Sequence, residues 1–493
     1  MVHDHITPER RLDQVHDPVE NRWGYFFAPE ALTSEGWMSG VRIKVGTSGL
    51  TRGQILSVET GAVAEAEDIR LAGPVMPGIP NLHSHATQRA IAGRTATRAV
   101  GDRDHFWSWR EAMYQAALNL TPEDIEVAAA QCFMEMLRAG YTSVAEFHYL
   151  HLGRDGQPYE NIAELSHRVI RAAKRVGLPI THLPVLYRWS GVHAAPPLEE
   201  QRRFILDMDQ YARLHQQLNE RYAQDPLVQV GYAAHSLRAV TPDDLRTLIE
   251  LRSTSGGDAP LHIHIAEQTA EVEMWQAAYQ ARPVEWLLDH APVDRHWTLV
   301  HATHVNEREV QRLAATEAVV GLCPSTEADL GDGIFPLLSF LESGGRYGVG
   351  SDSNVRSDPA EELRVLEWGQ RLHHQARNLS YSQYVQGDVG RAGRRSLGHS
   401  LWGAAIDGGN TSVQRPTGLR AGCWADWIVL NPHEDGLIGA KGHLWADQWI
   451  FASRHATPLE VYIAGQRVIE GGKHPLQDEI SSQYRERFGV RNS

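Results

Sequence analysis

Short apolar runs recur through the middle of the chain, separated by longer stretches in which apolar residues return every three or four positions. The first pattern is typical of buried β-strands and the second of amphipathic helices. The apolar runs lie at 76–82, 142–147, 179–187, 228–234, 260–266, 297–302, 318–323 and 347–352. The helical stretches between them include 122–139, 160–176, 243–251 and 307–315. Strands that alternate with helices in this way predict an α/β fold with a parallel sheet.

A succession of eight β/α units favours a (β/α)8 TIM-type barrel with insertions. The alternative is a doubly wound open sheet, but no glycine-rich phosphate loop follows the first predicted strand. The two ends of the chain contain short β-type runs instead, at 41–45, 54–59, 425–431 and 461–473. We expect residues 1–75 and 415–493 to form one small β-sandwich domain, and residues 76–414 to form the barrel.

Composition and charge narrow the possible partners. Hydrophobic residues make up 42% of the chain and charged residues 22%, which is ordinary for a globular protein. The formal net charge of −14 argues against a nucleic-acid surface, and an anionic substrate would need a local group of arginines. No apolar run is long enough to cross a membrane, and 3 cysteines are too few for a disulfide framework. We therefore expect a cytoplasmic protein that binds neither membrane nor nucleic acid.

Polar side chains gather where the predicted strands end. The residues that stand out are His83, His85, His264, His301 and Asp352. They follow or close the first, fifth, sixth and eighth strands. In a parallel barrel these strand ends meet at one face, where active sites assemble. Their repeated placement predicts that they share one site.

His83 and His85 are two positions apart, so on a continuing strand both side chains point to the same face and can reach one metal ion. An isolated pair of this kind is usually only a polar turn. Here His264 offers a third imidazole and Asp352 a carboxylate, and Zn²⁺ favours such nitrogen and oxygen ligands. The fourth strand carries no lysine that could bridge two metals. The sequence thus predicts one divalent metal ion, most readily Zn²⁺, although the ligand set also suits Fe or Mn.

Three residues are predicted to carry out the chemistry. Glu267 stands just beyond His264 and suits a proton shuttle, which takes a proton from the attacking water and passes it to the leaving group. Asp352 can hold that water as well as the metal. His301, one β/α repeat after His264, can stabilise developing charge or position the water. His262 shares the face of His264 but lies deeper, so we expect it to be packed and hydrogen-bonded.

Longer stretches carry a family resemblance, at 81–93, 106–114, 139–149, 235–242, 262–273, 299–304, 321–336 and 348–364. They resemble the amidohydrolase superfamily in its subgroup of mononuclear deaminases, and are similar to the bacterial formimidoylglutamate deiminase family. The resemblance covers nearly the whole barrel. It implies hydrolytic deimination of N-formimidoyl-L-glutamate to N-formyl-L-glutamate and ammonia, a reaction of histidine degradation, and it implies a homodimer.

The resemblance also implies a set of substrate-binding residues, namely Gln88, Arg110, Tyr149, His235 and Arg238. The implied substrate is a small dicarboxylate, and Arg110 and Arg238 can each bind one carboxylate through two hydrogen bonds. Two alternatives stay open. One is a related amidohydrolase deaminase that acts on a heterocycle or on another formimidoyl or guanidino acid. The other is a binding protein that keeps the barrel without the chemistry.

Overall fold

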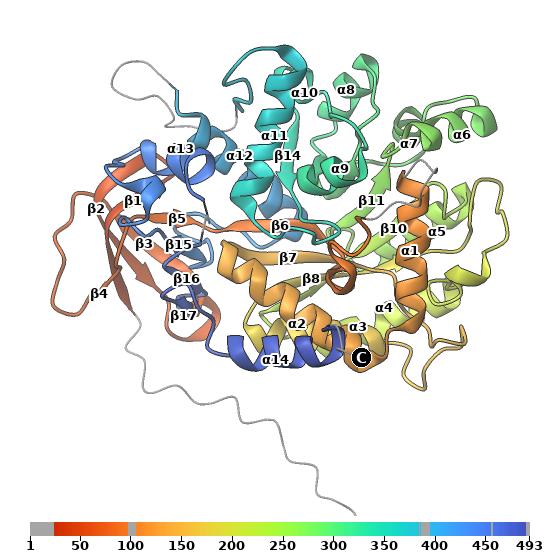
Figure 1. Cartoon of the computed structure of the whole chain (residues 1–493), viewed down its shortest axis with the longest axis horizontal. Helices are drawn as coiled ribbons and strands as arrows, with labels where there is room; N and C mark the ends of the chain where they lie inside the picture. The colour runs from red at the N-terminus through yellow and green to blue at the C-terminus, as the bar shows by residue number, and fades with distance from the viewer. Residues whose placement is uncertain (1–23, 97–104, 384, 386–394, 455–456, 490–493) are drawn as a thin grey trace, which may run out of the picture.

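The computed structural model describes residues 24–96, 105–383, 385, 395–454 and 457–489. Its strands form two sheets, which lie side by side in Figure 1. One is parallel and comes from the middle of the chain, and the other is mainly antiparallel and comes from both ends. The predicted fold class, a TIM-type barrel with a small β domain built from both termini, is confirmed.

The parallel sheet contains β6 (Ile79–Ser84), β7 (Tyr141–His148), β8 (Ile180–Leu186), β9 (Val228–Val230), β10 (Tyr232–Ser236), β11 (Leu261–Ile265), β12 (Trp297–His301), β13 (Val319–Leu322) and β14 (Arg346–Val349). The strands from β6 to β14 are neighbours in chain order, and β9 pairs beside β8. Because β9 and β10 together fill the fourth predicted position, every predicted barrel strand is present.

The barrel closes where the end of β6 meets the residues that follow β14. The backbone N–H of Asp352 donates to the carbonyl of His83, and the N–H of His85 donates to the carbonyl of Asp352, both at 2.9 Å. Gly350 sits at this seam, and a Cβ there would lie 2.8 Å from the Cβ of His83. The closure therefore has room only for glycine at position 350, and it fixes Asp352 beside His83 and His85.

The α-helices are α1 (Phe106–Asn119), α2 (Pro122–Ala139), α3 (Glu164–Val176), α4 (Met208–Tyr222), α5 (Pro242–Thr254), α6 (Thr269–Tyr279), α7 (Pro283–His290), α8 (Glu307–Ala314), α9 (Pro324–Leu330), α10 (Leu337–Glu342), α11 (Pro359–His374), α12 (Leu397–Val413), α13 (Leu444–Phe451) and α14 (Gln477–Phe488). Short 3₁₀ turns cover Gly49–Thr51, Ala86–Ile91 (η2), Glu199–Gln201 and Asp435–Leu437. None of the helices in the described ranges combines the length and apolar character needed to span a bilayer.

Local signals explain the helix ends that the sequence predicted well. The α2 helix has its predicted bounds because Thr121 accepts the N–H of Asp124, Pro122 opens the first turn, and Gly140 ends the helix at a φ of 104°.

The α12 helix packs against the barrel strands. The carbonyl of its Ser412 is 3.1 Å from Nε2 of His262, so His262 is buried and hydrogen-bonded, as predicted.

The terminal sheet contains β1 (Tyr25–Thr33), β2 (Gly36–Val45), β3 (Ile55–Glu59), β4 (Ile69–Arg70), β5 (Val75–Pro77), β15 (Trp427–Val429), β16 (Glu460–Ile463) and β17 (Gln466–Glu470). Its strand order is β17-β16-β15-β5-β1-β2-β3, with β4 also on β1. The pairing of β5 with β15 joins the two chain ends. Phe26, Trp427 and Tyr462 are buried against one another in a small core of its own.

The apolar run at 76–82 belongs to two strands rather than one. β5 lies in the terminal sheet and β6 in the barrel, and the chain passes from one to the other at Gly78. Because both strands are fully buried, the hydrophobic pattern shows no break between them. A Cβ on Gly78 would lie 2.1 Å from Cγ2 of Thr142, so glycine is required at the crossing. The predicted boundary between residues 75 and 76 falls inside β5.

Replacing Gly350 with alanine should disturb the barrel seam. The added methyl group would push against His83, so we expect the free energy of unfolding to fall by about 1–3 kcal/mol. Denaturant unfolding measures this. Gly24→Ala is the matched control, because a Cβ there meets nothing within 4 Å. Equal stabilities for the two variants would contradict a tight seam at Gly350.

Candidate active site

Four potential metal donors converge at the C-terminal ends of the barrel strands. His83 and His85 come from the end of β6, His264 from β11, and Asp352 from the segment after β14. Their donor atoms all lie within 4.8 Å of one another, and all four residues are buried. Nε2 of His264 is 2.9 Å from Nε2 of His83, and Oδ1 of Asp352 is 3.1 Å from Nε2 of His85. The structure thus brings the predicted ligand set to one point.

The outer ring nitrogens determine how two of these imidazoles face the centre. Nδ1 of His85 is 2.8 Å from the carbonyl of Phe147, and Nδ1 of His264 is 3.0 Å from the carbonyl of His235. A carbonyl only accepts, so Nδ1 carries the proton and Nε2 of each neutral ring presents a lone pair. Lone pairs directed at a buried carboxylate and at another imidazole repel one another unless a cation lies between them. This donor set fits a divalent metal, whose histidine ligands commonly bind a carbonyl through the outer nitrogen.

The charges of the site point the same way. Burial lowers the pKa of His83 to about 3 and lowers that of His264 well below its usual value. Burial would raise the pKa of Asp352, but the adjacent imidazoles of His83 and His85 hold it well below the usual range. The buried carboxylate therefore stays negative, with two of the three neighbouring imidazoles held neutral. A divalent cation would supply the missing positive charge.

His301, at the end of β12, lies among three carboxylates. Its Nε2 is 3.7 Å from Oε1 of Glu267 and 3.7 Å from Oδ2 of Asp352, and its Nδ1 is 3.2 Å from Oε1 of Glu327. Burial opposes a charge on this ring, but the surrounding carboxylates outweigh it and raise the pKa of His301 to about 10. Burial also raises the pKa of Glu267, against the opposing effect of His301 and Arg238. The pair of Glu267 and His301 is therefore able to hold a proton beside the metal donors.

Cys323 completes a second group of potential metal donors, with His301 and Asp352. The carboxylates around His301 favour a proton on its ring, and a protonated imidazole is a poor metal ligand. Burial also raises the pKa of the Cys323 thiol, so its metal-binding thiolate form is disfavoured. Both effects make His301 and Cys323 poorer metal donors than the first group.

Strained backbone marks the strand ends that carry these residues. His301, Ala302, Ala266 and Asp352 have φ values of 68°, 49°, 50° and 43°. Such left-handed conformations cost a non-glycine residue on the order of 1–3 kcal/mol and persist only where the surroundings hold them. Here the N–H of Ala302 donates to the carbonyl of Ile265 at 3.0 Å, and the N–H of His304 donates to Ala266 at 3.0 Å.

A pocket opens beside the metal donors. Apart from His83, every residue singled out as a site residue from the sequence lines it, namely His85, Gln88, Arg110, Tyr149, His235, Arg238, His264, Glu267, His301 and Asp352. The remaining walls are Phe106, Trp109, Met113, Tyr114 and Leu330, which the sequence reasoning did not single out. The signal for four of them was the stretch 106–114, which forms most of α1. The structure brings these residues together, and their individual roles stay predictions.

Two arginines contribute positive charge to this pocket. Arg110 comes from α1 and Arg238 follows β10, and their guanidinium carbons lie 4.4 and 5.8 Å from the ring centroid of Trp107. Contact with the ring face favours a guanidinium ion at each position. Arg238 is 3.8 Å from Oε2 of Glu267 and 3.8 Å from Oε2 of Glu271, beyond hydrogen-bonding distance. Its hydrogen-bonding capacity toward a ligand is therefore not used up by these carboxylates.

The other predicted binding residues offer hydrogen-bonding groups. Gln88, on η2, donates from Nε2 to the hydroxyl of Tyr149 at 2.8 Å. Its Oε1 is buried and has no protein partner among the described residues. His235 lies against the ring of Tyr187, with centroids 4.3 Å apart, and its Nδ1 is 3.1 Å from Oγ of Ser236. An acceptor from Gln88 and a ring edge from His235 are thus available to orient a bound molecule.

Three buried glutamates that the sequence reasoning missed hold the strand-end turns. Glu146 accepts the N–H of Ala86 at 2.7 Å, next to His85. Glu271 accepts the N–H of Glu267 at 3.1 Å, and Glu327 accepts the N–H of Cys323 at 2.9 Å. Glu271 and Glu327 stand in the first turns of α6 and α9, where acidic residues are common. The sequence could have marked those two as helix-start residues, but Glu146 lies within a strand and gave no such signal.

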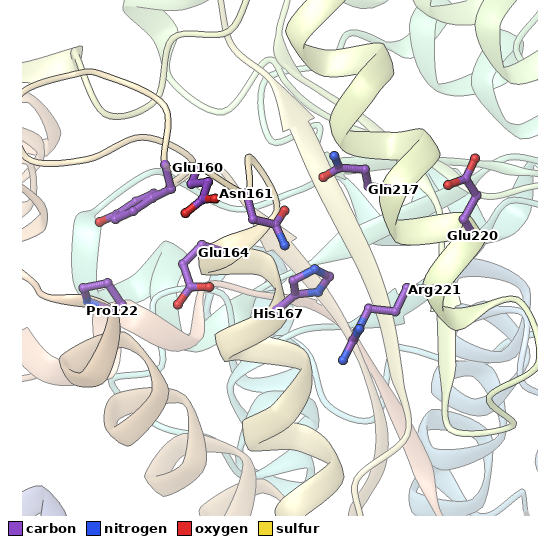
Figure 2. Close-up of a pocket in the computed structure, with 9 residues that line it drawn as sticks. Pro122, Glu160, Asn161, Glu164, His167, Gln217, Glu220 and Arg221 are labelled. Atoms are coloured by element: carbon purple, nitrogen blue, oxygen red, sulfur yellow. The ribbon is translucent and has the colours of Figure 1, made fainter. Parts of the chain in front are cut away.

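A larger hollow lies on the outer ring of helices, away from the strand ends, with a volume of about 830 Å³. In Figure 2 Glu160, Asn161, Glu164 and His167 lie on one side of it, and Gln217, Glu220 and Arg221 lie on the other. Neither group of potential metal donors found among the described residues includes any of these side chains. The pocket at the strand ends therefore remains the candidate active site.

Family comparisons agree with this geometry. The model described as "Amidohydrolase family" matches residues 75–387. The model described as "Formimidoylglutamate deiminase HutF, N-terminal domain" matches residues 25–72, which cover β1 to β4. The first match covers most of the barrel, and the second covers the N-terminal part of the terminal sheet.

Individual relatives are similar over most of their length. The formimidoylglutamate deiminase of Pseudomonas aeruginosa is 43% identical over 93% of this chain and 97% of its own. The 8-oxoguanine deaminase of the same organism is 27% identical over 68% of this chain and 72% of its own. The crystal structure of an amidohydrolase from Brucella melitensis superposes with a TM-score of 0.87 at 43% identity, over 94% of this chain and 99% of that one.

Substitution at the strand ends should separate a metal ligand from its structural neighbour. His264→Gln should weaken metal binding by at least about tenfold, because it removes one of the converging lone pairs. Metal analysis of the purified protein, with a chelator competition, measures this. His262→Gln, two positions deeper on β11, is the matched control and should keep its metal. Equal metal loss in both variants would contradict the predicted ligand set.

Proposed function

The chain belongs to the amidohydrolase family, and from this premise we propose that it hydrolyses N-formimidoyl-L-glutamate to N-formyl-L-glutamate and ammonia. It is a hydrolase of C–N bonds. The observation that carries the proposal is a single pocket in which metal donors, a proton-holding glutamate–histidine pair and two arginines meet. The 43% identity with a formimidoylglutamate deiminase over 93% of the chain supports this substrate.

The charges of this substrate match those of the pocket. Its two carboxylates call for cations, and Arg110 and Arg238 both line the pocket. Each guanidinium can bind one carboxylate through two parallel hydrogen bonds. The formimidoyl group is a basic amidine, which suits the side of the pocket where Glu267 and Asp352 lie. The local arginines also offset the net charge of −14, which repels an anionic molecule at a distance.

We propose one Zn²⁺ ion on His83, His85, His264 and Asp352, because three imidazoles and a carboxylate suit that metal. When bound, it would lower the pKa of a water molecule toward neutrality and so favour attack by hydroxide. Fe or Mn would also accept these ligands. We further propose that the protein is cytoplasmic and, from the family resemblance, that it is a homodimer.

The protein groups then move the protons. Water adds to the formimidoyl carbon, the bond from that carbon to the terminal nitrogen breaks, and the oxygen remains as the formyl oxygen. Glu267 passes the two protons of the water, one after the other, to the departing nitrogen, which leaves as ammonia. His301 lies 3.7 Å from both Glu267 and Asp352 and would orient the water or stabilise the developing charge.

Glu267→Gln should abolish turnover and leave the metal in place. The amide is nearly the same size as the carboxylate but cannot accept a proton, so we expect the rate of ammonia release to fall by at least about 100-fold. Ammonia release and metal content are measured on the same preparation. Ammonia release near the wild-type rate would contradict the assigned proton transfer.

The arginine pair distinguishes the proposed substrate from a heterocycle. Arg110→Gln and Arg238→Gln should each raise KM for N-formimidoyl-L-glutamate by about tenfold or more, because each removes a charged hydrogen-bond donor. The assay measures ammonia release from N-formimidoyl-L-glutamate beside its aspartate homologue and a purine. If the protein instead acts on a heterocycle, it would release ammonia from the purine alone, and KM for the purine would be the same in both variants as in the wild type.

A further inference from the structure

Among the residues that the structure describes, Glu327 is the acidic one that forms a hydrogen bond with the ring of His301. Its Oε1 lies 3.2 Å from Nδ1 of His301 and also accepts the N–H of Cys323 at 2.9 Å. It is 7% exposed and stands in the first turn of α9, beyond β13. It does not line the pocket, so a bound substrate meets His301 rather than Glu327.

From this contact we infer that Glu327 is a positioning residue, which fixes the ring orientation of His301 for the reaction. A carboxylate oxygen accepts hydrogen bonds, so Nδ1 of His301 must be the donor. The other ring nitrogen, Nε2, is then the one presented to Glu267 and Asp352. A ring turned by half a rotation about its Cβ–Cγ bond would bring Cδ2 to Glu327 and Cε1 toward Glu267 and Asp352, so that neither side would meet a ring nitrogen.

His301 needs this hydrogen bond because its own backbone does not fix the orientation of its ring. Its φ of 68° lies in the left-handed region, which is unfavourable for a residue with a side chain. Its ring stacks on that of His264, with centroids 5.5 Å apart and planes 12° from parallel. Stacking fixes the plane of the ring but not whether Nε2 or Cε1 faces Glu267 and Asp352. The bond to Glu327 makes that choice.

A capping role alone would not explain the position of Glu327, and α8 offers the comparison. Glu309 accepts the N–H of Asn306 at 2.9 Å, just as Glu327 accepts that of Cys323, and it is 2% exposed. In both helices the glutamate binds the N–H of the residue that precedes the first turn. Glu309 pairs with Arg282 at 2.7 Å, whereas Glu327 binds the catalytic histidine.

The inference rests on the proposed function, and the experiment separates the two. Glu327→Leu should lower kcat for N-formimidoyl-L-glutamate by about 10–100-fold, with KM and metal content unchanged, because substrate and metal contacts remain. Glu327→Gln should restore kcat to within a few-fold of wild type. Its amide oxygen can still accept both N–H groups, and Cys323 keeps that oxygen turned inward. Glu309→Leu should lose stability but keep the wild-type kcat.

A proton NMR measurement reports on the His301 ring directly and requires no substrate. The hydrogen-bonded Nδ1–H of His301 should give a downfield proton resonance, identified by its absence in His301→Gln. We expect it in wild type and Glu327→Gln, and expect it to be lost in Glu327→Leu. Glu327→Asp, which withdraws the oxygen by one methylene length, should weaken both this signal and kcat and serves if the leucine variant does not fold.

Two results would overturn the inference. One is a Glu327→Leu or Glu327→Asp protein with wild-type kcat and an unchanged His301 resonance. The other is an equal loss of kcat in Glu309→Leu, which would reduce Glu327 to a helix cap. A wild-type protein that releases no ammonia from N-formimidoyl-L-glutamate overturns the proposed substrate instead, and the resonance still tests the role of Glu327.

Discussion

Two backbone hydrogen bonds between the end of β6 and the segment after β14 decide where the chemistry can occur. They close the barrel, and they place Asp352 against His83 and His85, nearly 270 residues earlier in the chain. The seam is tight, since Gly350 has no room for a side chain beside His83. Asn81, two residues before His83, extends this contact, because its Nδ2 donates to Oγ of Ser351 at 2.6 Å. Barrel closure and ligand placement are therefore one structural event.

The candidate site is also an arrangement of buried charge. Glu267, Asp352 and Glu327 surround His301, and Arg238 lies close to Glu267. Burying such carboxylates is costly unless cations accompany them. A divalent ion on one side and a basic amidine beside Glu267 would complete the balance. The requirement for positive charge thus links the metal and the proposed substrate through the same group of acids.

Three buried glutamates hold the strand-end turns behind the residues that are proposed to react. Glu146, Glu271 and Glu327 each accept a backbone N–H at the turn that follows a functional strand end. Ala266, with a φ of 50°, lies in one of those turns, and His301 and Asp352 are strained in the same way at the ends of neighbouring strands. Backbone strain of this kind favours relaxation, and buried charge-assisted hydrogen bonds oppose it. The precision of the site therefore depends on residues that do not touch the substrate.

The sequence was enough to predict the barrel, because strand and helix periods are local properties of the chain. It was also enough to name the ligand candidates, because His83, His85, His264 and Asp352 stand at strand ends. It merged β5 with β6, since two buried strands in succession share one apolar pattern. It also missed Glu327 and Trp107, whose importance lies in what they face and not in their neighbours along the chain. Those contacts form only when the chain folds. Side chains from distant strands and helices meet at the barrel mouth, and no local spacing encodes the distance between them.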